Sequence, residues 1–339
     1  VSLISDLNDI NGETFGHLAT LVDFNFIFRH VVESGWWQSS KAFLVDNRGV
    51  SKITQGITTE ITGEGWSPAP SNDTTVRDDS VQFAAWGLRV DWHDLDGYFR
   101  RLLRTGLPFN IGSLVGATTL RIYVMGHERR APTTAEIARM AELADTAMHQ
   151  GALGLGSSLG YPPGSYASTE ELIALARVAG RHGGVYASHL RSESGGIRAA
   201  LAEALRIGRV AGVPVEIWHL KTTGASRGSM PQIIRFLDSA RASGTRIGAD
   251  AYPYTAVGRP LVASLPAWVQ TGGTAAMLGR LRDPRTRARL VRQSPSVGRQ
   301  ILLAVLDSSL RRYQGKTLGE IARDRRQSPI ETVIDIVLA

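Results

Sequence analysis

The stretch GGVYASHLRSESGGIRAALAEALRIGRVAGVPVEIWHLKT (183–222) contains a complete strand–helix–strand unit. Residues 185–190 and 213–220 are short apolar runs typical of strands, and the segment between them, 197–212, has helical periodicity and ends at a glycine. Strands joined through a helix pair in parallel, so the unit predicts a parallel α/β sheet. Both strands finish on the same pattern, in which a histidine is followed by leucine and a basic residue.

The same unit repeats with a period of about 30 residues, with strands predicted to begin near 154, 185, 215 and 246. Further helices are predicted at 168–184, where Ser168 and Glu171 have the spacing of a capping box, and at 230–244. The loops from strand to helix are longer than the turns from helix to strand. This favours a (β/α) barrel, which carries its functional loops at the strand C-termini. An open, doubly wound sheet is the alternative, but no G-x-G-x-x-G motif follows any predicted strand.

The upstream part of the chain continues this pattern less regularly. Helices are predicted at 94–106 and 134–151, and strands ending in Gly-rich loops at 56–65 and 109–116. Residues 1–35 show no clear period, so we treat them as a separate N-terminal segment.

The composition excludes several classes of function. The 339 residues include no cysteine, which excludes disulfides, thiolate zinc sites and a cysteine nucleophile. No apolar run approaches the length of about 18 residues that suggests a membrane span, and the first residues do not form a signal peptide. We therefore expect a cytoplasmic protein without a membrane partner. The formal net charge is +7, but the basic residues are scattered among acidic ones, so we expect no nucleic-acid partner either.

The two strand-end histidines are candidate metal ligands. Alternation along the strands predicts that each shares a face with the alternate residues before it: Val185 and Ala187 for His189, and Val215 and Ile217 for His219. Neutral imidazoles on adjacent strand ends can share a divalent ion. A hydrogen-bonded core histidine is the alternative for either residue alone.

Glu64 is the candidate third ligand. It lies in ITGEGWSPAP (61–70), after a predicted strand, between two glycines that let the backbone approach a ligand closely. An ordinary turn carboxylate is the alternative reading of this residue.

Two basic residues and a tyrosine are candidates for substrate binding. Lys221 and Arg191 each lie two residues beyond a histidine, a spacing that directs them to the same end of the sheet. Cations there can bind a substrate carboxylate or stabilise an oxyanion, although surface ion pairs would explain them equally well. Tyr161 follows another strand and could donate its hydroxyl to a substrate or pack against the adjacent prolines. Three residues of ADAYPYT are weaker candidates: Asp250, Tyr252 and Tyr254.

Five motifs together resemble the N-acyl-D-amino-acid deacylases, the D-aminoacylase branch of the amidohydrolase superfamily. They are KITQGITTEITGEGWSPAP (52–70), GALGLGSSLGYPPGSYASTEELIALA (151–176), GGVYASHLRSE (183–193), VPVEIWHLKTTG (213–224) and ADAYPYTA (249–256). They occur in the family's order and at consistent spacing over roughly residues 40–339, and the last 35 residues also look like a family segment.

The resemblance implies a metal-dependent TIM-type (β/α)8 barrel of the α/β class. This barrel would hydrolyse N-acyl-D-amino acids, which are small molecules, to a carboxylate and a D-amino acid. Residues 36–339 would form this barrel. One zinc ion (Zn2+) would be held by Glu64, His189 and His219. Family substrate-binding positions match Tyr161 and Lys221, and Arg191 falls in the corresponding loop.

The sequence departs from the family pattern in three places. Trp36 and Gln38 stand where the family commonly has His-x-His, which argues against a second metal because tryptophan cannot ligate zinc and an amide is a poor ligand. Residues 1–35 do not resemble the usual β-domain and first strand. The family's acid–base aspartate is expected on a late strand beyond Ala339, so we expect a barrel that is incomplete at both ends and assign no catalytic residue.

Two other functions remain open from the sequence. One is a cyclic-amide hydrolase of the dihydroorotase or hydantoinase type, in which a modified lysine usually bridges two metals. The other is an inactive, truncated family member that binds metal or ligand without turnover. The sequence leaves the oligomeric state open.

Overall fold

The computed structural model describes residues 2–8, 14–21, 56–85, 88–107, 109–252, 257–293, 297–303, 305 and 307–339. Strands β1 (Ser2–Asn8) and β2 (Thr14–Leu21) form an antiparallel hairpin in the segment whose sequence shows no clear period. None of the described helices is both long and apolar enough to cross a bilayer.

Seven short parallel strands form the centre of the molecule. Strands β3 (Thr59–Thr62) and β4 (Asn110–Ser113) pair with each other. Five further strands pair in chain order: β5 (Val115–Gly116), β6 (Gly154–Ser158), β7 (Val185–His189), β8 (Val215–Ile217) and β9 (Ile247–Ala249). Because each connection steps to the next neighbour without a reversal of order, the sheet is wound as in a (β/α) barrel and not as in a doubly wound sheet.

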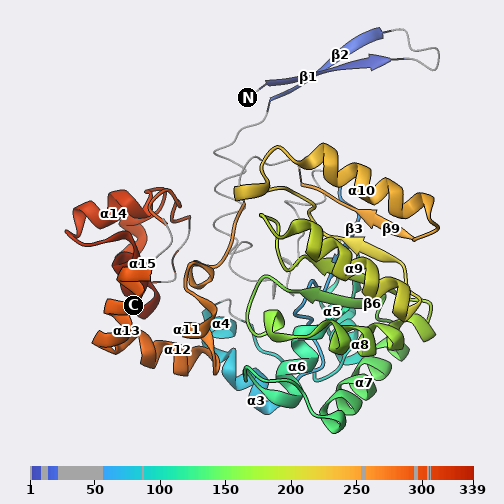
Figure 1. The fold of residues 1–339 in the computed structure, drawn as a ribbon, viewed down its shortest axis with the longest axis horizontal. Coiled ribbons are helices and arrows are strands. Elements are labelled where there is room, and N and C mark those ends of the chain that lie inside the picture. The colour runs from blue at the N-terminus through green and yellow to red at the C-terminus, as the bar shows by residue number, and fades with distance from the viewer. Residues whose placement is uncertain are drawn as a thin grey trace.

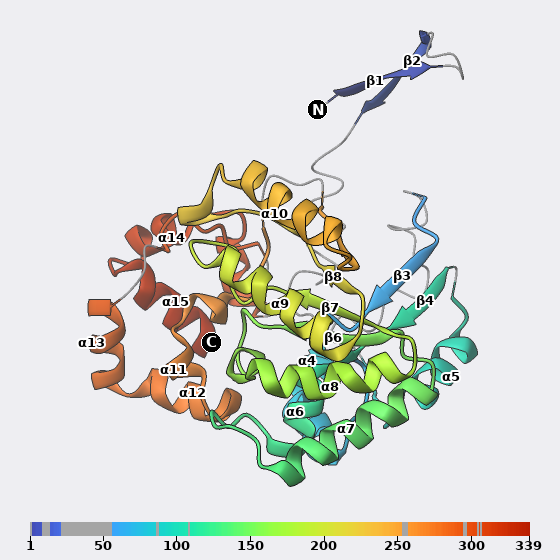
Figure 2. The ribbon, with the colours of Figure 1, turned by 45° about the vertical axis from the view of Figure 1, so that its right-hand side comes forward.

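The helices that accompany these strands include those predicted at 94–106, 134–151, 168–184, 197–212 and 230–244, and three that the sequence did not predict, at 73–78, 80–85 and 117–125. They are α3 (Asp73–Asp78), α4 (Ser80–Ala85), α5 (Leu95–Thr105), α6 (Ala117–Met125), α7 (Thr134–His149), α8 (Thr169–Arg181), α9 (Ile197–Ala211) and α10 (Met230–Ala242). Figures 1 and 2 show α7, α8 and α9 side by side along one side of the strands. The helices and strands enclose a buried cluster that includes Leu155, Tyr186 and Ile217.

The two faces of the sheet differ from the predicted ones on strand β8. Val215 and Ile217 are in register with Tyr186 and Ser188, the residues of β7 that point away from the His189 face. The face predicted from strand alternation is therefore confirmed for His189 and is wrong for His219. His219 lies beyond the end of β8 and has a positive φ of 43°, so a turn and not strand alternation directs its side chain.

The predicted capping box at the start of α8 is half confirmed. The Ser168 hydroxyl accepts a hydrogen bond from the Glu171 backbone N–H at 3.1 Å. The Glu171 carboxylate, however, does not return to the cap. It forms a fully buried ion pair with Arg121 of α6 at 2.7 Å, because an unpaired guanidinium inside the core would be far more costly than an unmade cap.

Residues 261–338 contribute helices and add no strand to the described sheet. They contain α11 (Ala267–Gln270), α12 (Gly273–Arg282), α13 (Pro284–Gln293), α14 (Leu318–Asp324) and α15 (Pro329–Leu338). These helices bury a second hydrophobic cluster, around Leu281, Leu318 and Val333, that is separate from the first. Figure 1 shows them in orange and red beside the strands.

Glycines bring the loop after β3 into backbone contact with the strand ends. A methyl group on Gly156 of β6 would overlap the Gly63 carbonyl oxygen, and one on Gly116 would overlap the Gly65 carbonyl oxygen. Gly63 itself has a φ of 98°, a conformation that favours glycine. The loop that carries Glu64 is therefore held against β5 and β6 by contacts that tolerate no side chain.

We expect Gly156→Ala to lower the free energy of unfolding by roughly 1–3 kcal/mol, as overpacking does, because Gly63 must move. The same movement displaces Glu64. Gly279→Ala in α12 is the matched control, since nothing lies within 4 Å of the added methyl group and alanine favours the helix. Urea unfolding of both variants checks this. Equal stability of Gly156→Ala and the parent would contradict the packing argument.

Candidate functional site

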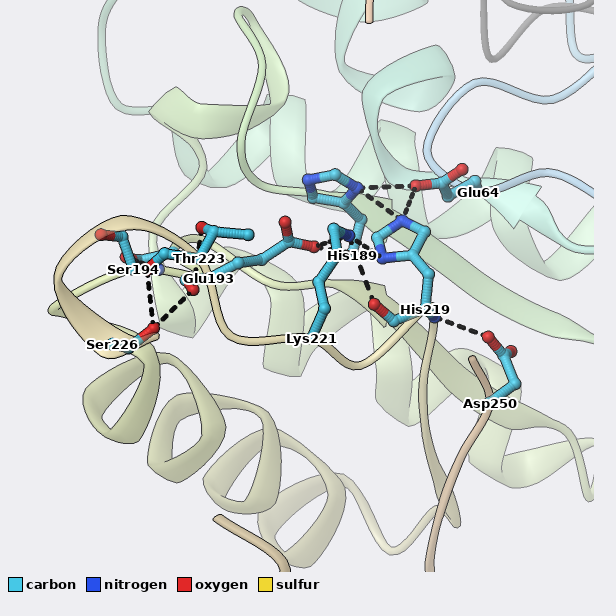
Figure 3. A network of polar contacts seen from close by, with 10 residues as sticks. Glu64, His189, Glu193, Ser194, His219, Lys221, Thr223, Ser226 and Asp250 are labelled. Atoms are coloured by element: carbon cyan, nitrogen blue, oxygen red, sulfur yellow. Dashed lines mark hydrogen bonds and ion pairs between the residues drawn. The ribbon is translucent and has the colours of Figure 1, made fainter. Parts of the chain in front are cut away.

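Three side chains from separate elements converge at the C-terminal ends of the strands. Glu64 comes from the loop after β3, His189 is the last residue of β7, and His219 follows β8. Glu64 Oε1 lies 2.8 Å from His189 Nδ1 and 3.0 Å from His219 Nε2, and the two ring nitrogens are 2.9 Å apart. Figure 3 shows the two imidazoles between Glu64 on one side and Lys221 on the other. The structure thus brings together the three residues predicted as ligands.

The three atoms fit a divalent metal ion. Two ring nitrogens and a carboxylate oxygen form a donor set that zinc accepts, and ligands about 2.0 Å from one zinc ion lie roughly 3.3 Å apart in a tetrahedral arrangement. The observed separations of 2.8 to 3.0 Å are close to this value. Among the described residues, one other group of side chains also brings metal-ligating atoms together.

Without a metal ion, hydrogen bonds and charges of the chain's own side chains stabilise this cluster. Burial by itself would raise the pKa of Glu64, but hydrogen bonds from His189 and His219 outweigh it and lower the pKa to about 2. Burial would lower the pKa of His219, but the carboxylates of Glu193 and Glu64 raise it to about 9. A positive charge between these side chains is therefore favoured, whether a proton or a metal ion supplies it.

The opposite nitrogen of His219 contacts a lysine–glutamate pair. Lys221 Nζ lies 2.9 Å from His219 Nδ1 and 2.5 Å from Glu193 Oε1. Burial would raise the pKa of Glu193, but hydrogen bonds from His219 and Lys221 lower it. Sequence reasoning missed Glu193. Its only signal was its place four residues after His189 in a motif already singled out.

The backbone of His219 is also held in place. Its N–H donates to Oδ1 of Asp250 at 2.6 Å, and Asp250 directly follows β9. Asp250, a weaker candidate from the sequence, therefore helps to position His219. The ring of Tyr252 lies 5.3 Å from Lys221 Nζ, within cation–π range.

Tyr161 lies beside the cluster, with its ring centroid 5.1 Å from that of His189. Burial raises the pKa of its hydroxyl, and the carboxylates of Glu64 and Glu193 add to this. The hydroxyl therefore stays protonated and can donate a hydrogen bond.

Arg191 is engaged elsewhere. Its Nε and Nη2 donate to the Glu203 carboxylate of α9, at 2.9 Å each. Its Nη1 and Nη2 donate to the carbonyl oxygens of Ser165 and Ala167, also at 2.9 Å. In the structure this side chain ties the loop after β6 to α9, and its predicted contact with a substrate stays a prediction. Trp36, Gln38 and Tyr254 lie outside the described residues.

Comparison with known proteins shows a consistent set of relatives. The chain is 36% identical over 263 residues to a D-aminoacylase of Alcaligenes xylosoxydans xylosoxydans, and the match covers 76% of this chain and 52% of the relative. It is 35% identical over 241 residues to an N-acyl-D-aspartate deacylase of the same organism, covering 68% and 45%. The chain therefore spans about half the length of the curated relatives it matches. No family model matches it.

Solved structures give the same picture. A D-aminoacylase that defines a subset of amidohydrolases has a TM-score of 0.63 at 28% identity, over 91% of this chain and 56% of that chain. An N-acyl-D-glutamate deacylase from Bordetella bronchiseptica has a TM-score of 0.68 at 25% identity, over 88% and 56%. That protein was solved with zinc and a phosphonate inhibitor that mimics the tetrahedral intermediate of its reaction.

The charges of the cluster predict how the stability of metal-free protein depends on pH. The pKa of Glu64 falls from 4.5 to about 2 on folding, so its contribution is present above pH 4.5 and is lost as the pH falls towards 2. The pKa of His219 rises from 6.5 to about 9, so its contribution is present below pH 6.5 and is lost as the pH rises through 9. We expect Glu64→Gln to cost roughly 1–3 kcal/mol at pH 5.5 and clearly less at pH 3.

Urea unfolding in the presence of a chelator measures this difference. Glu142→Gln, at an exposed position of α7, is the control and should change stability little at either pH. A Glu64→Gln penalty that is the same at pH 3 and pH 5.5 would contradict the charge argument.

Proposed function

The chain belongs to the N-acyl-D-amino-acid deacylases, the D-aminoacylase branch of the amidohydrolases, and we propose that it contains the metal-binding half of an enzyme that hydrolyses N-acyl-D-amino acids. The products are a carboxylate and a D-amino acid. The observation that carries the proposal is the convergence of Glu64 Oε1, His189 Nδ1 and His219 Nε2 at the strand ends. We also propose that the described strands belong to a closed (β/α)8 barrel, to which residues 36–339 contribute.

Glu64, His189 and His219 would hold one zinc ion. A zinc ion bound there would supply Lewis-acid chemistry, which polarises an amide carbonyl and lowers the pKa of a bound water molecule. Hydrogen bonds from the chain support the ligands: Asp250 accepts from the backbone N–H of His219, and Glu193 Oε1 lies 3.1 Å from the second nitrogen of its ring, where it can accept the ring proton. Such outer contacts orient a ligating imidazole.

Lys221 and Tyr161 are placed to bind the substrate. An N-acyl amino acid carries a carboxylate, which the Lys221 ammonium can bind beyond the His219 ring. The Tyr161 hydroxyl, beside His189, can donate to this carboxylate or to the oxyanion that develops from the amide. The Lys221 ammonium is oriented by Glu193 and lies over the face of Tyr252. Glu193 offsets part of the lysine charge, so the site favours a substrate with one carboxylate group over a strongly anionic one.

The position of Lys221 weighs against the cyclic-amide alternative. In enzymes of that type a modified lysine bridges two metals. Here Lys221 Nζ lies at Nδ1 of His219, whereas Nε2 of the same ring faces Glu64. The lysine is thus on the far side of the imidazole from the proposed zinc.

Metal analysis tests the ligand set. We expect purified, zinc-saturated protein to retain this zinc ion after dialysis, and His189→Ala combined with His219→Ala to lower the zinc content by one equivalent per chain. His93→Ala, at an exposed histidine outside the cluster, should change nothing. An unchanged zinc content in the double variant would overturn the proposed site.

Deacylation assays test the activity. The assay compares N-acetyl-D- with N-acetyl-L-amino acids as substrates of two zinc-loaded proteins. One is this chain, and the other is this chain with the flanking sequence of its reading frame. Release of the D-amino acid by at least one of the two proteins supports the proposal. Preference for the L-isomer would contradict it, and absence of turnover in both would favour the inactive-member alternative.

A further inference from the structure

A second cluster of metal-ligating side chains lies outside the proposed active site. Asp145 and His149 occupy consecutive turns of α7, at positions i and i+4, and His182 caps the C-terminus of α8. One carboxylate oxygen of Asp145 and one ring nitrogen of each histidine all lie within 4.8 Å of one another.

The three side chains already contact one another. His182 Nε2 lies 2.9 Å from Asp145 Oδ1, and His149 Nδ1 lies 3.4 Å from Asp145 Oδ2. The two imidazole rings stand at an angle of 80°, with their centroids 4.6 Å apart. The side chain of His182 is 22% exposed and that of His149 is 69% exposed. His149 Nδ1 also lies 2.9 Å from the Asp145 carbonyl oxygen, so His182 is held in place and His149 rotates towards it by leaving this contact. Small rotations would bring the three donors to the separation that a common ion requires.

The surroundings favour a cation. Helix α7 ends at His149 and α8 ends at Arg181, so the negative ends of two helix dipoles meet at this point. The only basic group contacting the Asp145 carboxylate apart from the histidines, among the described residues, is Arg181, at 3.5 Å. Its side chain is 63% exposed and can swing into solvent when an ion takes its place.

The cluster is remote from the first site. His182 precedes strand β7, whereas His189 is the last residue of that strand. The five residues of β7 span about 16 Å at 3.3 Å per residue, so the two clusters lie at opposite ends of the strand. No single ion can serve both.

We propose that Asp145, His149 and His182 form a second, peripheral site for a divalent transition metal of the zinc or copper class, which joins the C-terminal ends of α7 and α8. Two imidazoles and one carboxylate select such ions over magnesium and calcium, which prefer sets of oxygen ligands. Binding there stabilises the folded protein by an amount that grows with the logarithm of the free metal concentration above the dissociation constant, because the unfolded chain lacks the site.

Zinc titration by calorimetry tests the site in a background that lacks the first one. In the variant with His189→Ala and His219→Ala, we expect one equivalent of zinc to remain bound. Adding His149→Ala or His182→Ala should abolish it, whereas adding His93→Ala, the matched exposed histidine, should leave it unchanged. Absence of zinc binding in the background variant, or binding that survives both His149→Ala and His182→Ala, would overturn the proposal.

A spectroscopic measurement covers the case in which the background variant is poorly folded. In otherwise unaltered protein saturated with zinc at two equivalents, His149→Ala should lower the bound zinc to one equivalent. With Cu2+ as the probe, the nitrogen splitting in the electron paramagnetic resonance spectrum of the peripheral site should indicate two imidazoles, and this signal should be absent from His149→Ala. A copper spectrum without nitrogen splitting at that site would also contradict the assignment. Neither result depends on whether the chain hydrolyses N-acyl-D-amino acids.

Discussion

The close backbone contact between the loop after β3 and the ends of β5 and β6 determines the geometry of the proposed active site. Gly63 and Gly65 approach Gly156 and Gly116 so closely that no side chain fits at these positions. Glu64, between the two loop glycines, is thereby fixed in front of the strands that deliver the histidines. A carboxylate on an untethered loop would instead remain solvated, because burying it without compensation is costly.

Charged side chains fix the position of the His219 ring. His219 lies between two carboxylates, with Glu64 at one ring nitrogen and the Glu193–Lys221 pair at the other. Two carboxylates and one ammonium group thus surround the two imidazoles. In the metal-free chain a proton on His219, whose pKa is raised to about 9, balances the remaining negative charge, and a bound metal ion would take the place of that proton. Lys221 is paired with Glu193 and can contact a substrate carboxylate only on the side of the His219 ring that faces away from Glu64.

Much of this arrangement could be predicted from the sequence, since it follows local periodicity. The strand starts near 154, 185 and 215 match β6, β7 and β8, and the equivalent strand ends placed His189 beside His219. What could not be predicted depends on partners distant in the chain. The face of His219 is set by a turn after an unexpectedly short strand, and Glu171 leaves its cap for Arg121, which lies 50 residues away. The separate hydrophobic core of α11–α15 contains no strands, so the 30-residue repeat does not predict it. Glu193 lies in a loop, where no periodicity indicates the direction of its side chain.

The left-handed backbone at His219 lowers the stability of the fold but directs a metal-ligating imidazole into the proposed site. A positive φ of 43° is uncommon for any residue that carries a Cβ atom, and glycine adopts that conformation without this steric penalty. Selection for thermal stability alone would therefore tend to remove the imidazole, and with it one of the three donors. The histidine at this position is best understood as a residue retained against the preference of its own backbone.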